Sequence, residues 1–303
     1  MQKLIIGCGY LGLRVAQAWL ADGHNVSALT RSAMRAAELS RAGIRPIVGD
    51  ICEPATLDGL PAADTVLFAV GYDRLSGRSQ QAVYVDGLRN VLQTIVSRTN
   101  RLIYISSSSV YGQSDGEWVD ENSECCPVQA GGECCLAAEE LVHAFCNKDA
   151  AIQAGPTSCA NVLRLSGIYG PGRLLSRMES LRAGETLAGR GDAWLNLIHV
   201  DDAVLAVRAC EARLQPDQTY LVTDDQPIRR AEYYALLAKL AGAPPPRFNP
   251  ESPSGCGSGG INKRCRNRRI KEELELILTY PTINEGVPNA LGSTAGPIAS
   301  RWR

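Results

Sequence analysis

The chain has 303 residues, enough for one large α/β domain or for one domain that carries a smaller subdomain. Its 31 Lys and Arg nearly balance its 32 Asp and Glu, so the overall charge does not attract a nucleic-acid backbone. No segment reaches the ~20 apolar residues of a membrane span, and Met1 to Lys3 lead directly into an apolar strand rather than a signal peptide. We therefore expect a cytoplasmic protein, monomeric or homodimeric, that binds a small molecule and neither nucleic acid nor membrane.

In the first half, short apolar runs alternate with amphipathic segments, which predicts a parallel sheet with helices on both faces. The runs are apolar throughout, as in strands that are buried on both sides. The expected strands, including two from later in the chain, are Lys3–Gly7, Asn25–Thr30, Arg45–Val48, Thr65–Val70, Arg101–Ser106, Asn161–Leu165 and Gln218–Thr223. The expected helices of this half are Leu11–Ala21, Ser32–Ala42, Gln80–Ser97 and Cys134–Phe145.

After Gly170 the helical segments are separated by longer loops. The stretch Gly242 to Gly260 is rich in Pro, Gly and Ser, and is expected to be a mobile surface loop. The expected helices of this half are Leu174–Ala183, Asp201–Leu214, Arg229–Ala241 and Asn267–Leu278.

A glycine motif, G-x-G-x-x-G, directly follows the first expected strand and opens the first expected helix. Its first glycine permits a tight turn, its second leaves room for a pyrophosphate, and its third lets the helix approach the strand. The N–H groups at the start of the helix then face the phosphates. The motif residues expected to bind a dinucleotide are Gly7, Gly9, Tyr10, Leu11 and Gly12.

This context predicts a Rossmann fold with a seven-stranded, doubly wound parallel sheet over residues 1–168. We expect a small, interleaved substrate-binding lobe over 169–287, from which a strand near 218–223 returns to the sheet. The last segment, 288–303, is rich in small residues and is expected to be a flexible tail.

The end of the second expected strand favours NADP(H), with NAD as the alternative. NAD-binding sites place an acidic residue about 20 residues after the glycines, to bind the ribose 2′-hydroxyl. This chain has Thr30, Arg31 and Ser32 there, with Arg35 nearby. A guanidinium pairs with a 2′-phosphate through charge-assisted hydrogen bonds, whereas a carboxylate would repel it.

With these residues in view, the chain resembles the extended short-chain dehydrogenase/reductase family, also called the NAD-dependent epimerase/dehydratase group. Its atypical, YeeZ-like members are the most similar, through Lys263-Arg264, Asn267 and Tyr280-Pro281-Thr282 near the C-terminus. The resemblance implies that Asp50 and Ile51, after the third strand, and Ala69 and Val70, after the fourth, contact the cofactor. The other matching segments are Ile105 to Gly112, Arg164 to Arg173 and Asn196 to Ala203.

The family's reaction depends on a Tyr-x-x-x-Lys pair, which this chain lacks. The tyrosine exchanges a proton, and the lysine binds the nicotinamide ribose and lowers the pKa of the tyrosine. The family pattern of Pro, Tyr, Lys and Glu at intervals of four falls here on Pro127, Gly131, Cys135 and Glu139. The flanking residues match and the two reactive ones do not.

Other side chains are therefore candidates for the chemistry. Ser107 occupies the position of the family's catalytic serine, and its hydroxyl can polarise a carbonyl, although a serine at a strand end can also satisfy backbone groups. Tyr72 and Tyr169 are candidate proton donors, with core or rim positions as the alternative. Resemblance implies that Arg173, in a Gly-Pro-Gly turn, and Ser108 bind the substrate, with a nucleotide sugar as one candidate.

Several polar and sulfur-containing residues are interpreted as structural. His199 is expected to orient a strand-to-helix junction, and Asp201 and Asp202 to begin the next helix. The basic run from Lys263 to Lys271 is expected to be a solvated or anion-facing surface. The eleven cysteines, among them the doublets Cys125-Cys126 and Cys134-Cys135, are expected to be reduced thiols without a metal, although a nucleophilic thiol stays an alternative at Cys134 or Cys135.

Two functions remain open at this point. The first is an NADP(H)-binding, epimerase/dehydratase-like oxidoreductase that acts on a small molecule with non-standard catalytic residues. The second is a non-catalytic dinucleotide-binding protein, either a redox sensor or a scaffold. The glycine motif supports both equally, because fold alone does not determine function.

Overall fold

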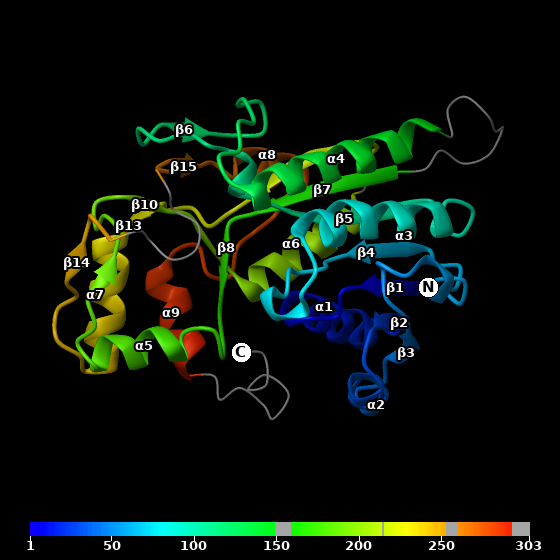
Figure 1. Ribbon diagram of the computed structural model, residues 1–303, viewed down its shortest axis with the longest axis horizontal. Coiled ribbons are helices and arrows are strands. Elements are labelled where there is room, and N and C mark those ends of the chain that lie inside the picture. The colour runs from blue at the N-terminus through cyan, green and yellow to red at the C-terminus, as the bar shows by residue number, and fades with distance from the viewer. Residues whose placement is uncertain (149–158, 214, 253–259, 293–303) are drawn as a thin grey trace. The chain divides into compact units, whose positions relative to one another are not determined.

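The computed structural model describes residues 1–148, 159–213, 215–252 and 260–292 (Figure 1). The chain forms two compact units and passes between them several times. Unit 1 contains residues 1–107, 130–164 and 204–220, and unit 2 contains 108–129, 165–203 and the chain from 221 onward. The two units are thus more interleaved than a boundary at residue 168 would give, since unit 2 begins directly after Ser107.

A seven-stranded sheet with the order β12-β7-β5-β4-β1-β2-β3 confirms the predicted Rossmann architecture. Strand β1 pairs in parallel with β2 and β4, and the parallel pairs β2–β3 and β4–β5 extend the sheet on both sides. Its strands are β1 (Gln2–Ile6), β2 (Asn25–Thr30), β3 (Arg45–Val48), β4 (Thr65–Phe68), β5 (Arg101–Ser107), β7 (Cys159–Leu165) and β12 (Thr219–Val222).

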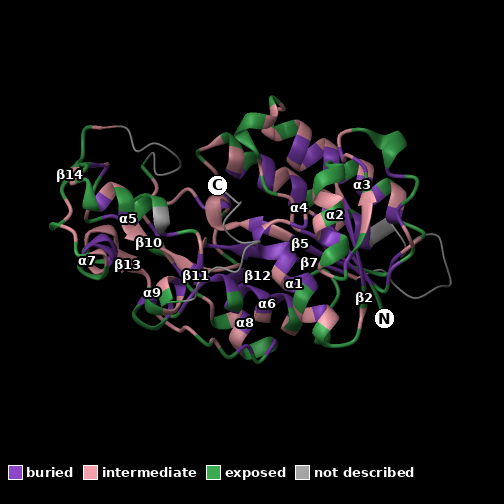
Figure 2. Cartoon of the chain, turned by 90° about the horizontal axis from the view of Figure 1, so that it is seen from below, coloured by how far each residue is buried: buried purple, intermediate pink, exposed green. Residues whose placement is uncertain are grey.

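Helices cover both faces of this sheet. In Figure 2, α3 and α4 lie on one side of strands β5 and β7, and α1 and α6 lie on the other. The expected helix over Gln80–Ser97 is divided, because a π-helical turn, η3 (Ala82–Asp86), precedes α3. The helices are α1 (Tyr10–Ala21), α2 (Ala33–Arg41), α3 (Gly87–Ile95), α4 (Ala130–Lys148) and α6 (Val200–Ala212), with short 3₁₀ turns η1 (Pro54–Thr56), η2 (Arg74–Ser76) and η4 (Ser108–Val110).

The core of unit 1 lies between the sheet and helices α3 and α4. Figure 2 shows the central strands as buried, and the apolar side chains of β4 and β5 are at most 2% exposed at Phe68, Leu102 and Tyr104. Burial on both faces explains why these strands are uniformly apolar. Strand β3 is the edge of the sheet, where Pro46 is tolerated and Val48 is 58% exposed.

Among its described residues, unit 2 has four short strand pairs and four helices, besides the first residues of α6. The pairs are β8 (Gly167–Tyr169) with β11 (Leu197–His199), β9 (Leu187–Ala188) with β14 (Phe248–Asn249), β10 (Trp194–Leu195) with β13 (Ile228–Arg229), and β6 (Trp118–Val119) with β15 (Arg264–Cys265). The helices are α5 (Leu175–Arg182), α7 (Arg230–Ala241), α8 (Arg268–Glu273) and α9 (Ile283–Gly292).

Two segments of unit 2 differ from expectation. Residues 288–292 belong to α9 rather than to a flexible tail, because Val287 and Ala290 pack into an apolar cluster with Leu237 of α7; residues 293–303 lie outside the described chain. Helix α8 ends at Glu273 rather than Leu278, since Glu275 adopts a φ of +50°, which a helix does not allow.

Candidate functional site

The glycine motif forms the turn between β1 and α1. Gly7 has a φ of +95°, and a Cβ there would lie 2.6 Å from the backbone of Ala69, while a Cβ at Gly12 would overlap the carbonyl oxygen of Gly7. These two glycines therefore permit close backbone packing. A Cβ at Gly9 would meet no atom within 4 Å. The open space at Gly9 adjoins the start of α1 at Tyr10, whose first turn has no acidic residue, so the turn fits a pyrophosphate group.

The end of β2 presents an arginine, Arg31, whose described partner is one exposed carboxylate. Thr30 Oγ1 accepts a hydrogen bond from the N–H of Ser32 at 3.4 Å, and the Ser32 hydroxyl caps α2 by accepting from the N–H of Arg35 at 3.3 Å. The guanidinium of Arg35 pairs with the carboxylate three residues further along α2, at 2.7 Å. Arg31 is 54% exposed, and its guanidinium lies 3.6 Å from the half-exposed carboxylate of Asp73. The side chain of Arg31 is thus more exposed than that of Arg35 and is held by a longer ion pair.

The next two strands end at the same edge of the sheet. The Asp50 carboxylate is held by the N–H of Cys52 and by the guanidinium of Arg78, each at 2.9 Å, and Ile51 is buried against α3. Beyond β4, the N–H of Ala69 donates to Ile6 of β1 at 2.8 Å, and Val70 follows it half-buried. Since carboxyl ends of parallel strands share one edge, the expected cofactor residues gather there.

A buried ion pair holds the end of β5 and places Ser107. Arg164 of β7 binds both carboxylate oxygens of Glu139 on α4, through Nη2 at 2.7 Å and Nε at 3.0 and 3.2 Å. The hydroxyl of Ser106 donates to the same carboxylate at 2.5 Å. Three elements of unit 1 are thereby joined next to Ser107, which is half-buried at the end of β5.

Helix α4 carries Gly131 and Cys135, the two positions at which the resemblance places the acid–base pair. Gly131 lies against the side chain of Gln80, and Cys135 is buried, 7% exposed. Burial and two nearby carboxylates raise the pKa of the Cys134 thiol, which disfavours a thiolate nucleophile. The Tyr72 hydroxyl is engaged as a donor to the carbonyl of Arg78 at 2.7 Å.

Unit 2 contains a cluster of buried rings around His199. This histidine is fully buried, with Tyr169 edge-on at 5.2 Å and Tyr280 at 4.1 Å between ring centroids. Its Nδ1 accepts from the N–H of Asp201 at 3.2 Å, so it orients the start of α6 as expected. The Asp202 carboxylate, however, accepts from backbone N–H groups of Thr279 and Tyr280, at 2.7 and 2.9 Å, and so ties α6 to the segment before α9.

The Tyr169 hydroxyl of this cluster, which lies against Gly286, has no hydrogen-bond partner among the residues that the structure describes. The same is true of one buried carboxylate oxygen of Asp224. The other oxygen of Asp224 accepts from the N–H of Gln226 at 3.3 Å. Because burial disfavours the charged form, it raises the pKa of Asp224 to about 8 and that of Tyr169 well above its usual value.

The two candidate substrate-binding residues also lie in unit 2. Arg173 is exposed, and its N–H closes the Gly-Pro-Gly turn on the carbonyl of Gly170 at 3.1 Å. Ser108 is half-buried and hydrogen-bonds to the Cys265 thiol.

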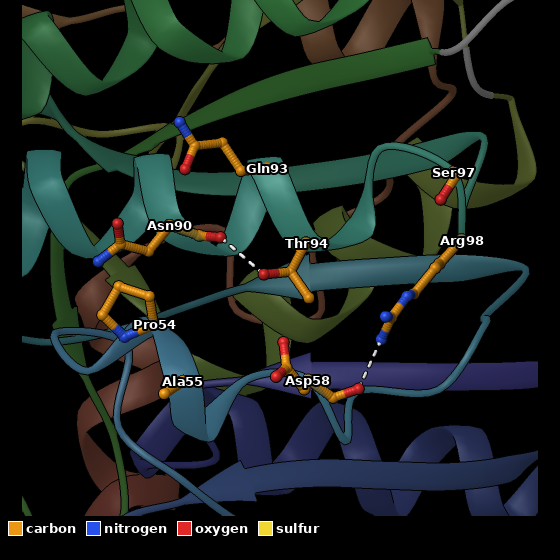
Figure 3. Close-up of a pocket in the computed structure, with 8 residues that line it drawn as sticks. All are labelled: Pro54, Ala55, Asp58, Asn90, Gln93, Thr94, Ser97 and Arg98. Atoms are coloured by element: carbon orange, nitrogen blue, oxygen red, sulfur yellow. Dashed lines mark hydrogen bonds between the residues drawn. The ribbon is translucent and has the colours of Figure 1, made fainter.

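A hollow on the surface of unit 1 is lined by none of these residues. As Figure 3 shows, it lies between α3 and the segment at residues 54–58, and Arg98 at its rim donates to the carbonyl of Asp58 at 3.0 Å. Among the described residues, all ten cysteines are free thiols and no group of side chains is arranged to hold a metal ion. No helix in the described ranges is long and apolar enough to cross a bilayer.

The sequence profile of the NAD dependent epimerase/dehydratase family matches residues 4–222. The chain belongs to this family. It is 29% identical to Protein YeeZ of Escherichia coli over 93% of this chain and 97% of that protein. It is 30% identical to 3-diazoavenalumate denitrifying reductase of a Streptomyces species, over 82% of this chain and 84% of that protein. A solved putative NAD-dependent epimerase/dehydratase from Methylobacillus flagellatus superimposes with a TM-score of 0.73 at 28% identity, over 96% and 98% of the two chains.

Membership of this family supports an NAD(P)-dependent enzyme of the oxidoreductase type. Sequence reasoning located the glycine turn and Arg31, but it missed Asp73, Asp224 and the buried environment of Lys263. Asp224 and Lys263 lie in unit 2 and belong to no cofactor-binding motif. The one signal for Asp224 is its position directly after an apolar strand.

Proposed function

We propose that the chain is an NADP(H)-dependent oxidoreductase that acts on the carbonyl or alcohol of a small molecule without a Tyr-x-x-x-Lys pair. The observation that carries this proposal is Arg31, a half-exposed guanidinium that directly follows β2, where an NAD site has a carboxylate. The Streptomyces relative, named as a reductase, supports the same class of reaction.

The charges around Arg31 support NADP(H) over NAD(H). Asp73 lies close enough to pair with Arg31, but both side chains are about half exposed, and such pairs contribute about 0–1 kcal/mol. A 2′-phosphate carries more charge and binds a guanidinium through two N–H groups. It therefore competes effectively with Asp73 for Arg31.

For the reaction itself, Ser107 is the hydroxyl proposed to hold the substrate oxygen. The bound cofactor supplies hydride chemistry at its nicotinamide ring. Ser107 lies at the end of β5, and the neighbouring Ser106–Glu139 hydrogen bond fixes the backbone there. A preorganised donor at this position stabilises charge that develops on a carbonyl oxygen.

The experiment is a calorimetric titration of NADPH and NADH into the wild type and into Arg31→Asp, Asp73→Asn and Arg101→Asp. We expect the wild type to prefer NADPH and Arg31→Asp to lose about tenfold to a hundredfold of NADPH affinity. Asp73→Asn should bind NADPH more tightly, because a repelling carboxylate is removed. Arg101→Asp is the control, because this exposed arginine is the first residue of β5 and lies at the amino ends of the strands, away from the expected cofactor residues at their carboxyl ends. Equal wild-type affinities for both cofactors would refute the NADP(H) proposal.

A non-catalytic sensor or scaffold is the second candidate, and Gly131 and Cys135 favour it. The two are separated by following NADPH absorbance with a panel of aldehydes and ketones, and by following the interconversion of nucleotide sugars directly. The sugars are included because Arg173 is an exposed cation at a turn. Tight NADPH binding without turnover of any compound would favour the sensor.

A further inference from the structure

Lys263 is held in place from both sides of its backbone. It directly precedes β15, whose residue Arg264 pairs with Trp118 of β6. The side chain of Asn196 bridges the same segment: its Nδ2 donates to the carbonyl of Lys263 at 3.0 Å, and its Oδ1 accepts from the N–H of Cys265 at 2.6 Å. The position of the Lys263 side chain is therefore fixed by neighbouring elements of unit 2.

The ammonium group of Lys263 is buried but only partly satisfied. The residue is 5% exposed, and Nζ donates to the carbonyl of Tyr111 at 2.5 Å. No carboxylate lies within ion-pair distance of it in the part of the chain that the structure describes. The titratable groups that face it are the thiols of Cys126 and Cys265, and burial lowers the pKa of Lys263. An ammonium has three N–H donors, so two remain for a ligand.

Of the two buried lysines among the described residues, Lys3 and Lys263, only Lys263 lacks a carboxylate partner there. Lys3 is also buried, but it pairs with the Glu211 carboxylate and donates to Thr65 Oγ1 at 3.2 Å. Lys271 pairs with Asp225 at 2.8 Å. A buried cation that serves only the fold is normally paired, because an uncompensated charge is costly.

The location of this amino group suggests its use. Tyr111 ends the serine loop (residues 108–111), and Ser108 in the same loop hydrogen-bonds to the thiol of Cys265, two residues after Lys263. We propose that Lys263 is a substrate-binding residue, whose ammonium donates to a carbonyl or carboxylate oxygen of the substrate at the serine loop. This inference rests on the proposed function. It gives the serine loop a cation of its own, in a chain whose α4 has none at Cys135.

The test uses the full chain labelled with ¹³Cε-lysine. The sequence contains five lysines, so five signals are expected. The variants Lys263→Arg, Lys239→Arg and Lys271→Arg assign the signals of these three residues. Each signal is titrated with pH in the absence of ligand, with oxamate, and with inorganic phosphate, both with and without NADPH. Because a bound anion stabilises the ammonium, we expect the pKa of Lys263 to rise by about half a unit or more with oxamate. The exposed Lys239 is the control and should not respond.

Each outcome decides the proposal. If oxamate raises the pKa of Lys263 and of no other lysine, the proposal is supported. If only phosphate raises the pKa, or if the pKa of Lys239 rises equally, the site binds an adventitious ion only and the proposal is overturned. No shift with either probe also overturns it. The cofactor question is decided separately: calorimetry that shows no NADPH binding refutes the proposed function, while the titration without NADPH still tests Lys263. In a turnover assay, Lys263→Met should raise KM at least tenfold, and Lys263→Arg should recover part of that loss.

Discussion

Replacing Asp224 with Asn should stabilise the protein, and by an amount that grows with pH. Asp224 is 1% exposed, and burial raises the pKa of its carboxyl from 3.8 to about 8. Between these two values the folded protein keeps a proton that the unfolded chain has lost. The folded state therefore binds more protons, and its stability falls as pH rises through this window. Below about pH 4 both states are protonated, so the contribution is fully present there.

The shift in pKa sets the magnitude. At about 1.4 kcal/mol per unit, the interval from 3.8 to about 8 corresponds to an upper limit on the order of 5 kcal/mol, reached near pH 8. About half of this difference should be present at pH 6. The Asn side chain has the same shape, stays neutral and can still accept from the N–H of Gln226, which now donates to Asp224 at 3.3 Å. We therefore expect the free energies of unfolding of Asp224→Asn and wild type to diverge steadily between pH 4 and pH 8.

The measurement is urea unfolding at pH 4, 5, 6, 7 and 8, followed by circular dichroism. Asp225→Asn is the matched control, because this neighbouring carboxylate is exposed and pairs with Lys271. Comparing variant with wild type at each pH cancels the contributions of other carboxyls, such as Asp202, whose pKa burial also raises. A stability difference that is the same at pH 4 and pH 8 would show that the Asp224 carboxyl does not stay protonated in the fold.

Three further variants test the candidate site. Gly9→Val should abolish dinucleotide binding without unfolding the chain, because the new side chain fills space that no protein atom occupies; unchanged NADPH affinity in a fluorescence titration would mean that the turn binds no pyrophosphate. Ser107→Ala should lower any turnover by about 10²-fold with little change in NADPH affinity. Brisk epimerisation of a nucleotide sugar by the wild type, unaffected by Ser107→Ala, would contradict the assignment of Ser107. Activity gained by Gly131→Tyr/Cys135→Lys would show that the site still accepts a substrate of the family.

The local features of the sheet were predictable because they depend on local pattern. The expected strands agree with the observed ones to within two residues, since each is an apolar run that ends at a glycine or polar residue. The glycine turn was equally accessible, because Gly7, Gly9 and Gly12 act through backbone conformation and space. Predictions failed where tertiary packing determines the structure. Pro288 was expected to begin a flexible tail, but it lies inside α9, where its neighbour Val287 is fully buried.

Long-range charge arrangements were not predictable from spacing. Asp73 lies 42 positions after Arg31, yet its carboxylate is 3.6 Å from that guanidinium. The contact of Lys263 with the carbonyl of Tyr111 spans 152 positions. Such pairs depend on how loops return to a sheet edge or a strand pair, which neither propensity nor periodicity encodes.

The buried pair of Glu139 and Arg164 has a consequence for how this helix can change over generations. It attaches α4 to the sheet from a position beyond both Gly131 and Cys135. The residues that anchor α4 are thus different from Gly131 and Cys135, the positions that would carry its chemistry. Mutation of Gly131 or Cys135 leaves the Glu139–Arg164 ion pair intact, so the reaction can change during evolution while the fold is retained.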